Sequence, residues 1–159
     1  MKRIPIVFLQ TVILLVGLGA LALLIWLPLI EGRATNLDLP SIYLDPFILY
    51  GYLSSTAFFI ALYQAFKLLG YIGKNQVFTS KSVKAIRSIK YCAFTLGILI
   101  VAAGLYIRMT HHKEDDPAGF LAICIVTAFA SITVATAAAL FERLLQNAVA
   151  MKSENDLTI

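Results

Sequence analysis

Charged residues are scarce in this chain. Asp, Glu, Lys and Arg make up 14% of its 159 residues, hydrophobic residues make up 60%, and the mean hydropathy is +0.84. A soluble domain has about a quarter of its residues charged, so the composition excludes an ordinary soluble domain. The missing charges leave four uncharged runs, at residues 4–30, 46–66, 91–107 and 117–141.

Motifs that carry chemistry are absent as well. The sequence has no glycine-rich phosphate loop and no H-E-x-x-H, C-x-x-C or G-x-S-x-G motif. The central part of each run lacks ionisable residues, which argues against a proton-coupled transporter or an ion pump. Cys92 and Cys124 are predicted to lie about 20 Å apart in depth, too far for a disulfide. We therefore predict no catalytic residue and no cofactor.

One short segment combines histidine with carboxylates, which are possible metal ligands. It holds His111, His112 and Asp115. Adjacent histidines on a loop rarely face one ion together, and the neighbouring Lys113 opposes a cation. We therefore expect a solvated loop here, and no metal site.

Each uncharged run is close to or above the length of about 20 residues that crosses a bilayer. The third run is the shortest, and snorkelling of Lys90 and Arg108 extends it. The first run is longer than a signal-peptide core of about 7–15 residues, so we expect a retained helix. The sequence thus predicts an all-α integral membrane four-helix bundle, one domain over residues 1–159. The predicted spans are about 5–30, 46–69, 91–109 and 117–141.

The placement of Lys and Arg predicts the orientation. If the N-terminus is cytoplasmic, the inner side has ten basic and three acidic residues, a net charge of +7. The outer side then has three basic and six acidic residues, a net charge of −3. Short cytoplasmic loops are rich in Lys and Arg, so both termini are expected in the cytoplasm. The protein is then a multi-pass membrane protein, and its basic character reflects orientation rather than direct binding of nucleic acid.

Three segments outside the spans have patterns of their own. Residues 31–45 are expected to form an outer interfacial turn or strand, or a plain loop. Residues 80–90, capped by Thr79 or Ser80, form a basic amphipathic helix between the second and third spans. The tail, residues 142–159, continues the fourth helix, and its last residues, 157–159, are predicted to form a short strand that needs a partner edge.

Polar and small residues recur inside the spans. The polar candidates are Tyr63, Gln64, Thr127 and Ser131. We expect Gln64 to form an interhelical hydrogen bond. Small residues spaced by four predict close helix packing, and a cavity lined by Ser and Thr remains an alternative. These residues are Ala57, Ala61 and Ala65 in the second span, and Thr127, Ser131, Ala135 and Ala139 in the fourth.

Several stretches resemble the bacterial membrane-protein family known as domain of unknown function 2975. They are residues 61–69, Phe78, 82–83, 86–91, 142–145 and the closing octet Lys-Ser-Glu-Asn-Asp-Leu-Thr-Ile at 152–159. The resemblance implies a four-helix inner-membrane protein without an assigned activity. Genes for similar proteins often lie beside a small helix-turn-helix regulator of the Cro/C1 type, which implies a membrane protein that holds or silences such a partner.

Two functions from different classes follow from these patterns. The first is a non-enzymatic regulator or adaptor whose cytoplasmic face binds a protein, while its basic residues also contact anionic lipid. The second is a binder or carrier of a lipid or small apolar molecule between the helices. A homo-oligomer is left open. The surface predicted for partner or lipid consists of Lys74, Lys81, Lys84, Arg87, Lys90, Glu154, Asn155, Asp156, Leu157, Thr158 and Ile159.

The predicted orientation can be tested with reporters fused after Ile159. A reporter that works only in the cytoplasm should be active, because the basic side of the chain is retained inside. A reporter that works only outside the cytoplasm should be silent, and its activity would overturn the orientation.

Overall fold

The computed structural model describes residues 3–30, 39–110 and 117–157. These residues form five helices, α1 (Arg3–Ile30), α2 (Leu39–Tyr43), α3 (Pro46–Gly73), α4 (Ser80–Thr110) and α5 (Ala118–Leu157). Four of them, all but α2, are long and apolar enough to cross a membrane. The predicted all-α fold with four membrane helices is confirmed, and no strand occurs in the described ranges.

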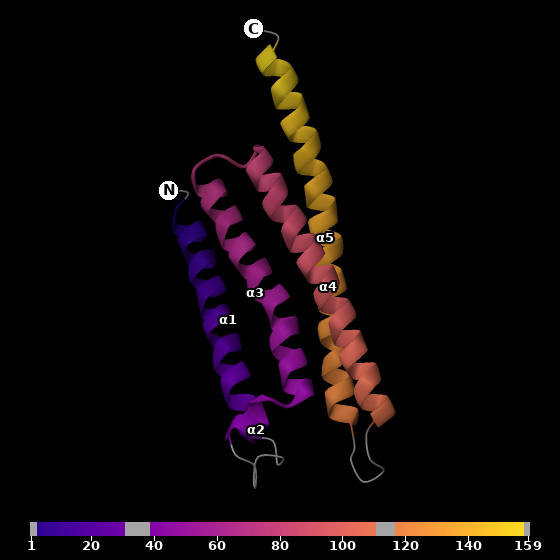
Figure 1. Cartoon of the computed structure of the whole chain (residues 1–159). Helices are drawn as coiled ribbons and strands as arrows, with labels where there is room; N and C mark the ends of the chain where they lie inside the picture. Colours follow the sequence, from indigo (N-terminus) through magenta and orange to yellow (C-terminus); the bar gives the residue numbers. More distant parts are fainter. Residues whose placement is uncertain (1–2, 31–38, 111–116, 158–159) are drawn as a thin grey trace.

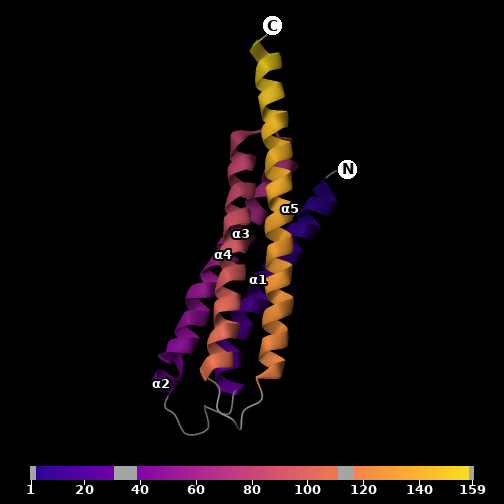
Figure 2. The ribbon, with the colours of Figure 1, turned by 90° about the vertical axis from the view of Figure 1, so that its right-hand side faces the viewer.

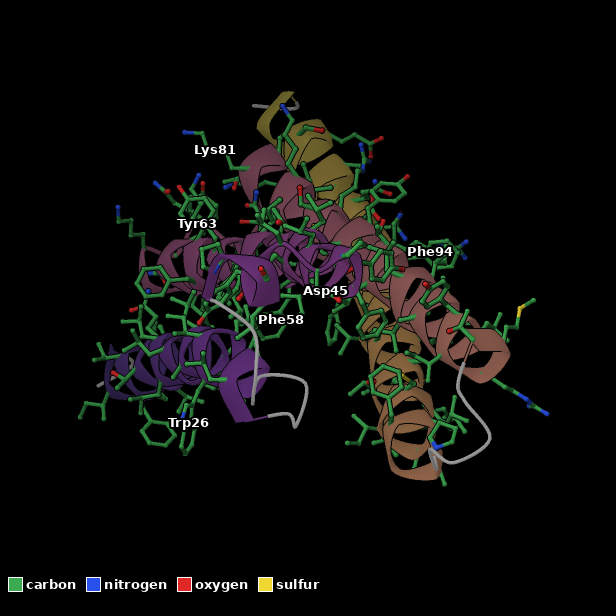
Figure 3. The ribbon with its side chains drawn as sticks, turned by 60° about the horizontal axis from the view of Figure 1, so that its bottom comes forward. Trp26, Asp45, Phe58, Tyr63, Lys81 and Phe94 are labelled. Atoms are coloured by element: carbon green, nitrogen blue, oxygen red, sulfur yellow. The ribbon has the colours of Figure 1, made fainter. Side chains whose placement is uncertain are left out.

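The long helices pack in the order of the sequence (Figure 1). Helix α1 packs on α3, α3 on α4, and α4 on α5, and the contact between α4 and α5 is the most extensive. Among the described residues, the other pairs of long helices touch only marginally. The bundle is therefore an open row, and most of its apolar surface is left for lipid. Trp26, for example, is 64% exposed and points away from the neighbouring helices (Figure 3).

The start of α3 follows from its first two residues. The Asp45 carboxylate accepts hydrogen bonds from the backbone N–H groups of Phe47, at 2.8 Å, and Ile48, at 3.3 Å. Pro46 occupies the first turn, where its missing N–H leaves no bond unmade. Helix α3 therefore begins at the first residue of the second uncharged run, residues 46–66.

Small side chains bring α4 and α5 close together. A Cβ atom on Gly97 would lie 3.6 Å from Cβ of Ser131, and one on Gly104 would lie 3.4 Å from Cβ of Cys124. Between apolar helices in lipid, such close packing takes the place of a hydrophobic driving force. The buried residues of α5 are Cys124, Ala128, Ser131, Ala135, Ala138 and Glu142. Their spacing alternates between four and three, so of the predicted stripe Ser131 and Ala135 are buried whereas Thr127 is exposed.

A proline near the end of α1 leaves a carbonyl group that α3 satisfies. Pro28 has no N–H, so the Leu24 carbonyl lacks its helical donor. The Tyr52 hydroxyl donates to that oxygen at 2.9 Å, and the Tyr43 hydroxyl of α2 donates to the Ile25 carbonyl at 3.1 Å. Backbone groups inside a bilayer must be satisfied by protein, so these tyrosines join α1 to its neighbours.

The connecting segments differ in part from their predictions. Residues 39–43 form the short helix α2 rather than a turn or strand. The described part of the tail is helical as far as Leu157, so the predicted strand is wrong at that residue, and Thr158 and Ile159 lie outside the described residues. Residues 80–90 are helical as predicted, and they are the first turns of α4 without a break. In α4 and α5 the helix continues because neither residues 80–90 nor residues 142–157 contain a proline or glycine that would stop it.

Helix α5 is longer than a membrane span. Its 40 residues extend about 60 Å at 1.5 Å per residue, whereas the hydrocarbon core is about 30 Å thick. Charged residues begin at Glu142, which marks the end of the apolar run. The last turns of α5 project past the ends of the other helices (Figures 1 and 2).

Replacing Tyr52 with Phe should lower the free energy of unfolding in detergent by about 1 kcal/mol, because the Leu24 carbonyl loses its donor. Thermal unfolding of the two purified proteins measures the difference. Tyr63→Phe is the matched control, since the Tyr63 ring is exposed and its hydroxyl has no partner among the described residues. Equal losses in both variants would contradict the role of the Tyr52 hydroxyl.

Candidate functional site

The residues predicted to meet a partner gather at one end of the bundle, which we call the basic end. It comprises the connection from α3 to α4, the first turns of α4 and the part of α5 from Glu142 onward. Both the N-terminal end of α1 and the C-terminal end of α5 lie on this side (Figure 1).

The connection is fixed by the way in which α3 ends. Asn75 has a left-handed backbone, with φ of 56°. Its N–H donates to the Ile72 carbonyl at 3.1 Å, and the N–H of Gln76 donates to the Tyr71 carbonyl at 2.9 Å. This pair of bonds closes the last turn of the helix and satisfies two of its free carbonyl groups. Asparagine tolerates this backbone conformation better than most residues, so Asn75 turns the chain toward α4.

The start of α4 is held by a fully buried serine. The Ser82 hydroxyl donates to the Gln76 carbonyl at 3.0 Å, and the Thr79 hydroxyl donates to the same oxygen at 2.9 Å. Val83 and Ile86 are buried on the same part of the helix. The first turns of α4 therefore have a packed inner face, and their lysines are attached to a rigid support.

A buried carboxylate joins α4 to α5 at the membrane boundary. Glu142 is 5% exposed. Its Oε1 atom lies 2.6 Å from Nε of Arg87, and its Oε2 atom lies 2.6 Å from Nζ of Lys90. Gln146 adds a hydrogen bond from Nε2 to Oε1 at 3.3 Å. We call this group of four side chains the Glu142 clamp.

The surroundings of Glu142 keep it ionised. Hydrogen bonds from Lys90 and then from Arg87 hold the pKa of its carboxyl group below the usual glutamate value. Both cations lie one turn apart on α4, so a single carboxylate accepts from both. A charged hydrogen-bonded group of this kind fixes how α5 is positioned along α4.

The clamp divides the predicted basic surface into two parts. Arg87 and Lys90 bind Glu142 and therefore have a structural role. Lys74, Lys81 and Lys84 are exposed, and none has an acidic partner in the described part of the chain. Figure 3 is seen obliquely from the end that holds α2, and Lys81 lies toward the opposite end of the molecule. We call these three residues the basic corner.

The tail residues of the predicted surface do not form one patch. Glu154 is exposed on α5, and Asn155, Asp156 and Leu157 continue the helix. They lie beyond the basic corner along α5, because this helix projects from the bundle (Figure 2).

The polar residues of the spans mostly turn back on their own helices. The Thr127 hydroxyl donates to the Ile123 carbonyl at 2.6 Å. Tyr63 is 57% exposed, with Nζ of Lys67 4.9 Å from its ring centroid. Gln64 makes no interhelical hydrogen bond among the described residues, so that prediction is wrong.

Gln10, which the sequence interpretation overlooked, joins α1 to α3 instead. Its Nε2 atom lies 3.5 Å from the Phe66 carbonyl oxygen. Gln10 carries the single side-chain amide of the first uncharged run, residues 4–30. A polar side chain in so apolar a segment was the signal that could have identified it.

A lateral groove lies over α4 between α3 and α5. Its volume is about 440 Å³ and its lining is almost entirely apolar. Residues on its walls include Ala57, Ala61, Ala65, Leu96, Ala130 and Val134. Thr127 and Ser131, the residues of the alternative cavity lined by Ser and Thr, both border this groove. The Thr127 hydroxyl is directed to its own helix, and the rest of the lining is apolar.

The weak metal candidates His111, His112 and Asp115 lie outside the described residues. Within the described ranges, no group of three His, Cys, Asp or Glu side chains could hold a metal ion.

The ion pairs of the Glu142 clamp were not predicted from the sequence. The sequence marks residues 86–91 and 142–145 as separate stretches of the family resemblance, and nothing in it pairs Glu142 with Arg87 or Lys90. The position of Glu142 directly after an apolar run, with Arg87 and Lys90 three residues apart on a neighbouring helix, was the available signal. Such a signal becomes specific only when the register of two helices is known.

Comparisons with known proteins support this membrane architecture. The family described as "Protein of unknown function (DUF2975)" matches residues 28–159. The chain is 42% identical over 162 residues to the uncharacterized membrane protein YoaS of Bacillus subtilis (strain 168), and the match covers all of both chains. No solved structure matches the chain.

Replacing Glu142 with Gln should lower the free energy of unfolding in detergent by about 1 to 2 kcal/mol, since two charge-assisted hydrogen bonds are lost and both cations remain partly solvated. The lowered pKa means that this stabilisation is present above the usual carboxyl pKa of about 4.3 and is lost as the pH falls through the folded-state pKa. Thermal unfolding of the two proteins from neutral pH to well below pH of about 4 measures it, because the loss occurs below the usual carboxyl pKa.

Two controls accompany this comparison. Arg143→Gln removes an exposed neighbouring charge and should change stability by no more than about 0.5 kcal/mol. The double variant Arg87→Gln, Glu142→Gln should lose less than the sum of the single losses, because the residues interact directly. Strict additivity would contradict the clamp.

Proposed function

This chain belongs to the DUF2975 family, and we propose that it is a non-enzymatic membrane adaptor whose basic corner binds an acidic surface of a cytosolic protein. It is a membrane protein with four helices long and apolar enough to span. The positive-inside rule supports a cytoplasmic location for the basic end.

The exposure of Lys74, Lys81 and Lys84 carries the proposal. Arg87 and Lys90 have a nearby carboxylate, but the three corner lysines have none in the described part of the chain. An exposed lysine that pairs with one acidic residue of a partner protein would contribute only about 0.2–1 kcal/mol to the binding free energy. Binding therefore needs several such lysines on one rigid surface. The buried Ser82 and the closed end of α3 supply that rigidity.

The family resemblance suggests the kind of partner. A small helix-turn-helix regulator of the Cro/C1 type, held at the membrane through an acidic surface, would be kept from its DNA. The tail of α5 projects into the same compartment and offers a second contact.

The lateral groove supports a second candidate function, the binding or carriage of a lipid or small apolar molecule. Its volume of about 440 Å³ lies in the usual range of ligand sites, about 300–1,000 Å³. Such sites usually also place a few polar groups that orient the ligand. This groove has an almost purely apolar lining, so we rank it second.

The basic corner is tested with the triple variant Lys74→Gln, Lys81→Gln, Lys84→Gln. Capture from native membranes, followed by quantitative mass spectrometry, should show a cytosolic protein whose yield falls about tenfold relative to wild type, equivalent to about 1.4 kcal/mol. The matched variant with Arg at all three positions keeps the charge and should retain that protein.

Three further measurements make the result decisive. The reporter after Ile159 verifies that the triple Gln variant keeps its orientation. A chain ending at Lys152 separates the contribution of the tail. Identical captured proteins in wild type and in the triple Gln variant would refute the proposal, whereas a copurifying lipid lost in Ala61→Phe would favour the groove.

A further inference from the structure

The face of α5 that points away from α4 has its own regular pattern. Beyond Glu142 the large apolar residues that are exposed are Leu144 and Met151, at 62% and 64%. They are seven residues apart, so they lie on one face of the helix. Leu140, 59% exposed, and Asn147, also exposed, lie on the same face. Residues 140, 144, 147 and 151 are thus spaced by four, three and four.

The same spacing continues into the apolar part of α5. The stripe consists of Val126, Ala130, Thr133, Ala137, Leu140, Leu144, Asn147 and Met151, all exposed, and Ala130 at its edge also borders the lateral groove. It extends over about 38 Å at 1.5 Å per residue. From Val126 to Met151 it carries no charge, although Glu142, Arg143 and Lys152 lie along the same part of the chain, and the next position of the spacing is Glu154. The stripe thus stays uncharged for about two turns after the helix has left the apolar run.

We propose that this stripe is the contact between two copies of the chain, with their α5 helices side by side and parallel. Lipid can cover only the part from Val126 to Ala137, and a soluble protein can cover only the part beyond Glu142. Another membrane chain covers both. A second copy inserted in the same orientation presents the same residues at the same depth.

The composition along the stripe fits a parallel, in-register pair. Ala130, Thr133 and Ala137 allow close approach within the membrane. Leu144 and Met151 meet their equivalents outside it, where burial of apolar surface is favourable. Asn147 meets Asn147 of the second copy, and a single polar residue in such a seam fixes register and the number of helices. The stripe is separate from the basic corner, so the two proposals can fail independently.

Cysteine cross-linking in native membranes tests the stripe. In full-length chains with Cys92→Ala and Cys124→Ala, single cysteines replace Leu144 or Met151. Oxidation should give disulfide-linked dimers at both positions. Phe141 and Lys152, exposed residues at neighbouring heights on another side of α5, are the matched control positions and should give few.

Energy transfer between fluorescent chains tagged after Ile159 provides a second measurement that keeps both native cysteines. Leu144→Glu should raise the dissociation constant of the pair at least about tenfold, while Lys152→Glu should leave it within about twofold. Equal cross-linking at stripe and control positions, or the absence of energy transfer in wild type, would overturn the proposal.

Discussion

The packing of α4 against α5 is the interaction on which the rest of the structure depends. Gly97 and Gly104 remove side chains from α4 where Ser131 and Cys124 approach, so the two backbones come close at these positions. In lipid the gain comes from this close contact rather than from removing apolar surface from water. At the boundary of the apolar run the interaction changes character, and Glu142 joins the helices through charge.

The Glu142 clamp has consequences for the surface around it. Because Arg87 and Lys90 are occupied, the positive charge that remains accessible belongs to Lys74, Lys81 and Lys84. Because α5 is fixed along α4 on one face, its opposite face is directed outward over its whole length. The proposed adaptor surface and the proposed contact between two copies thus arise from the same helix pair, on different sides of it. Two copies joined through α5 would present two basic corners to the same side of the membrane.

Much of the fold was predictable from the sequence, because a bilayer leaves few choices. Backbone groups in lipid must form their hydrogen bonds within the chain, so four apolar runs give four helices, and the Asp45-Pro46 pair marks where α3 begins. The short strand predicted at the tail was wrong at Leu157, because the helix continued where local sequence offered no stop. The interhelical bond predicted for Gln64 was wrong, because the face that a residue presents depends on how the helix is rotated. The roles of Gln10 and Tyr52 could not be found in advance, because their acceptors are carbonyl groups of distant residues.

The sequence by itself determined that the chain crosses a membrane with four helices and that its basic residues collect on one side, since both properties depend on the order of apolar and charged residues along the chain. The tertiary structure alone decided which of those basic residues pair with Glu142 and which stay exposed. It also decided that the helices form an open row with α5 projecting from it. These features depend on distances between atoms that are 52 to 55 residues apart in the chain, and such distances are set by the depth and rotation at which two helices pack.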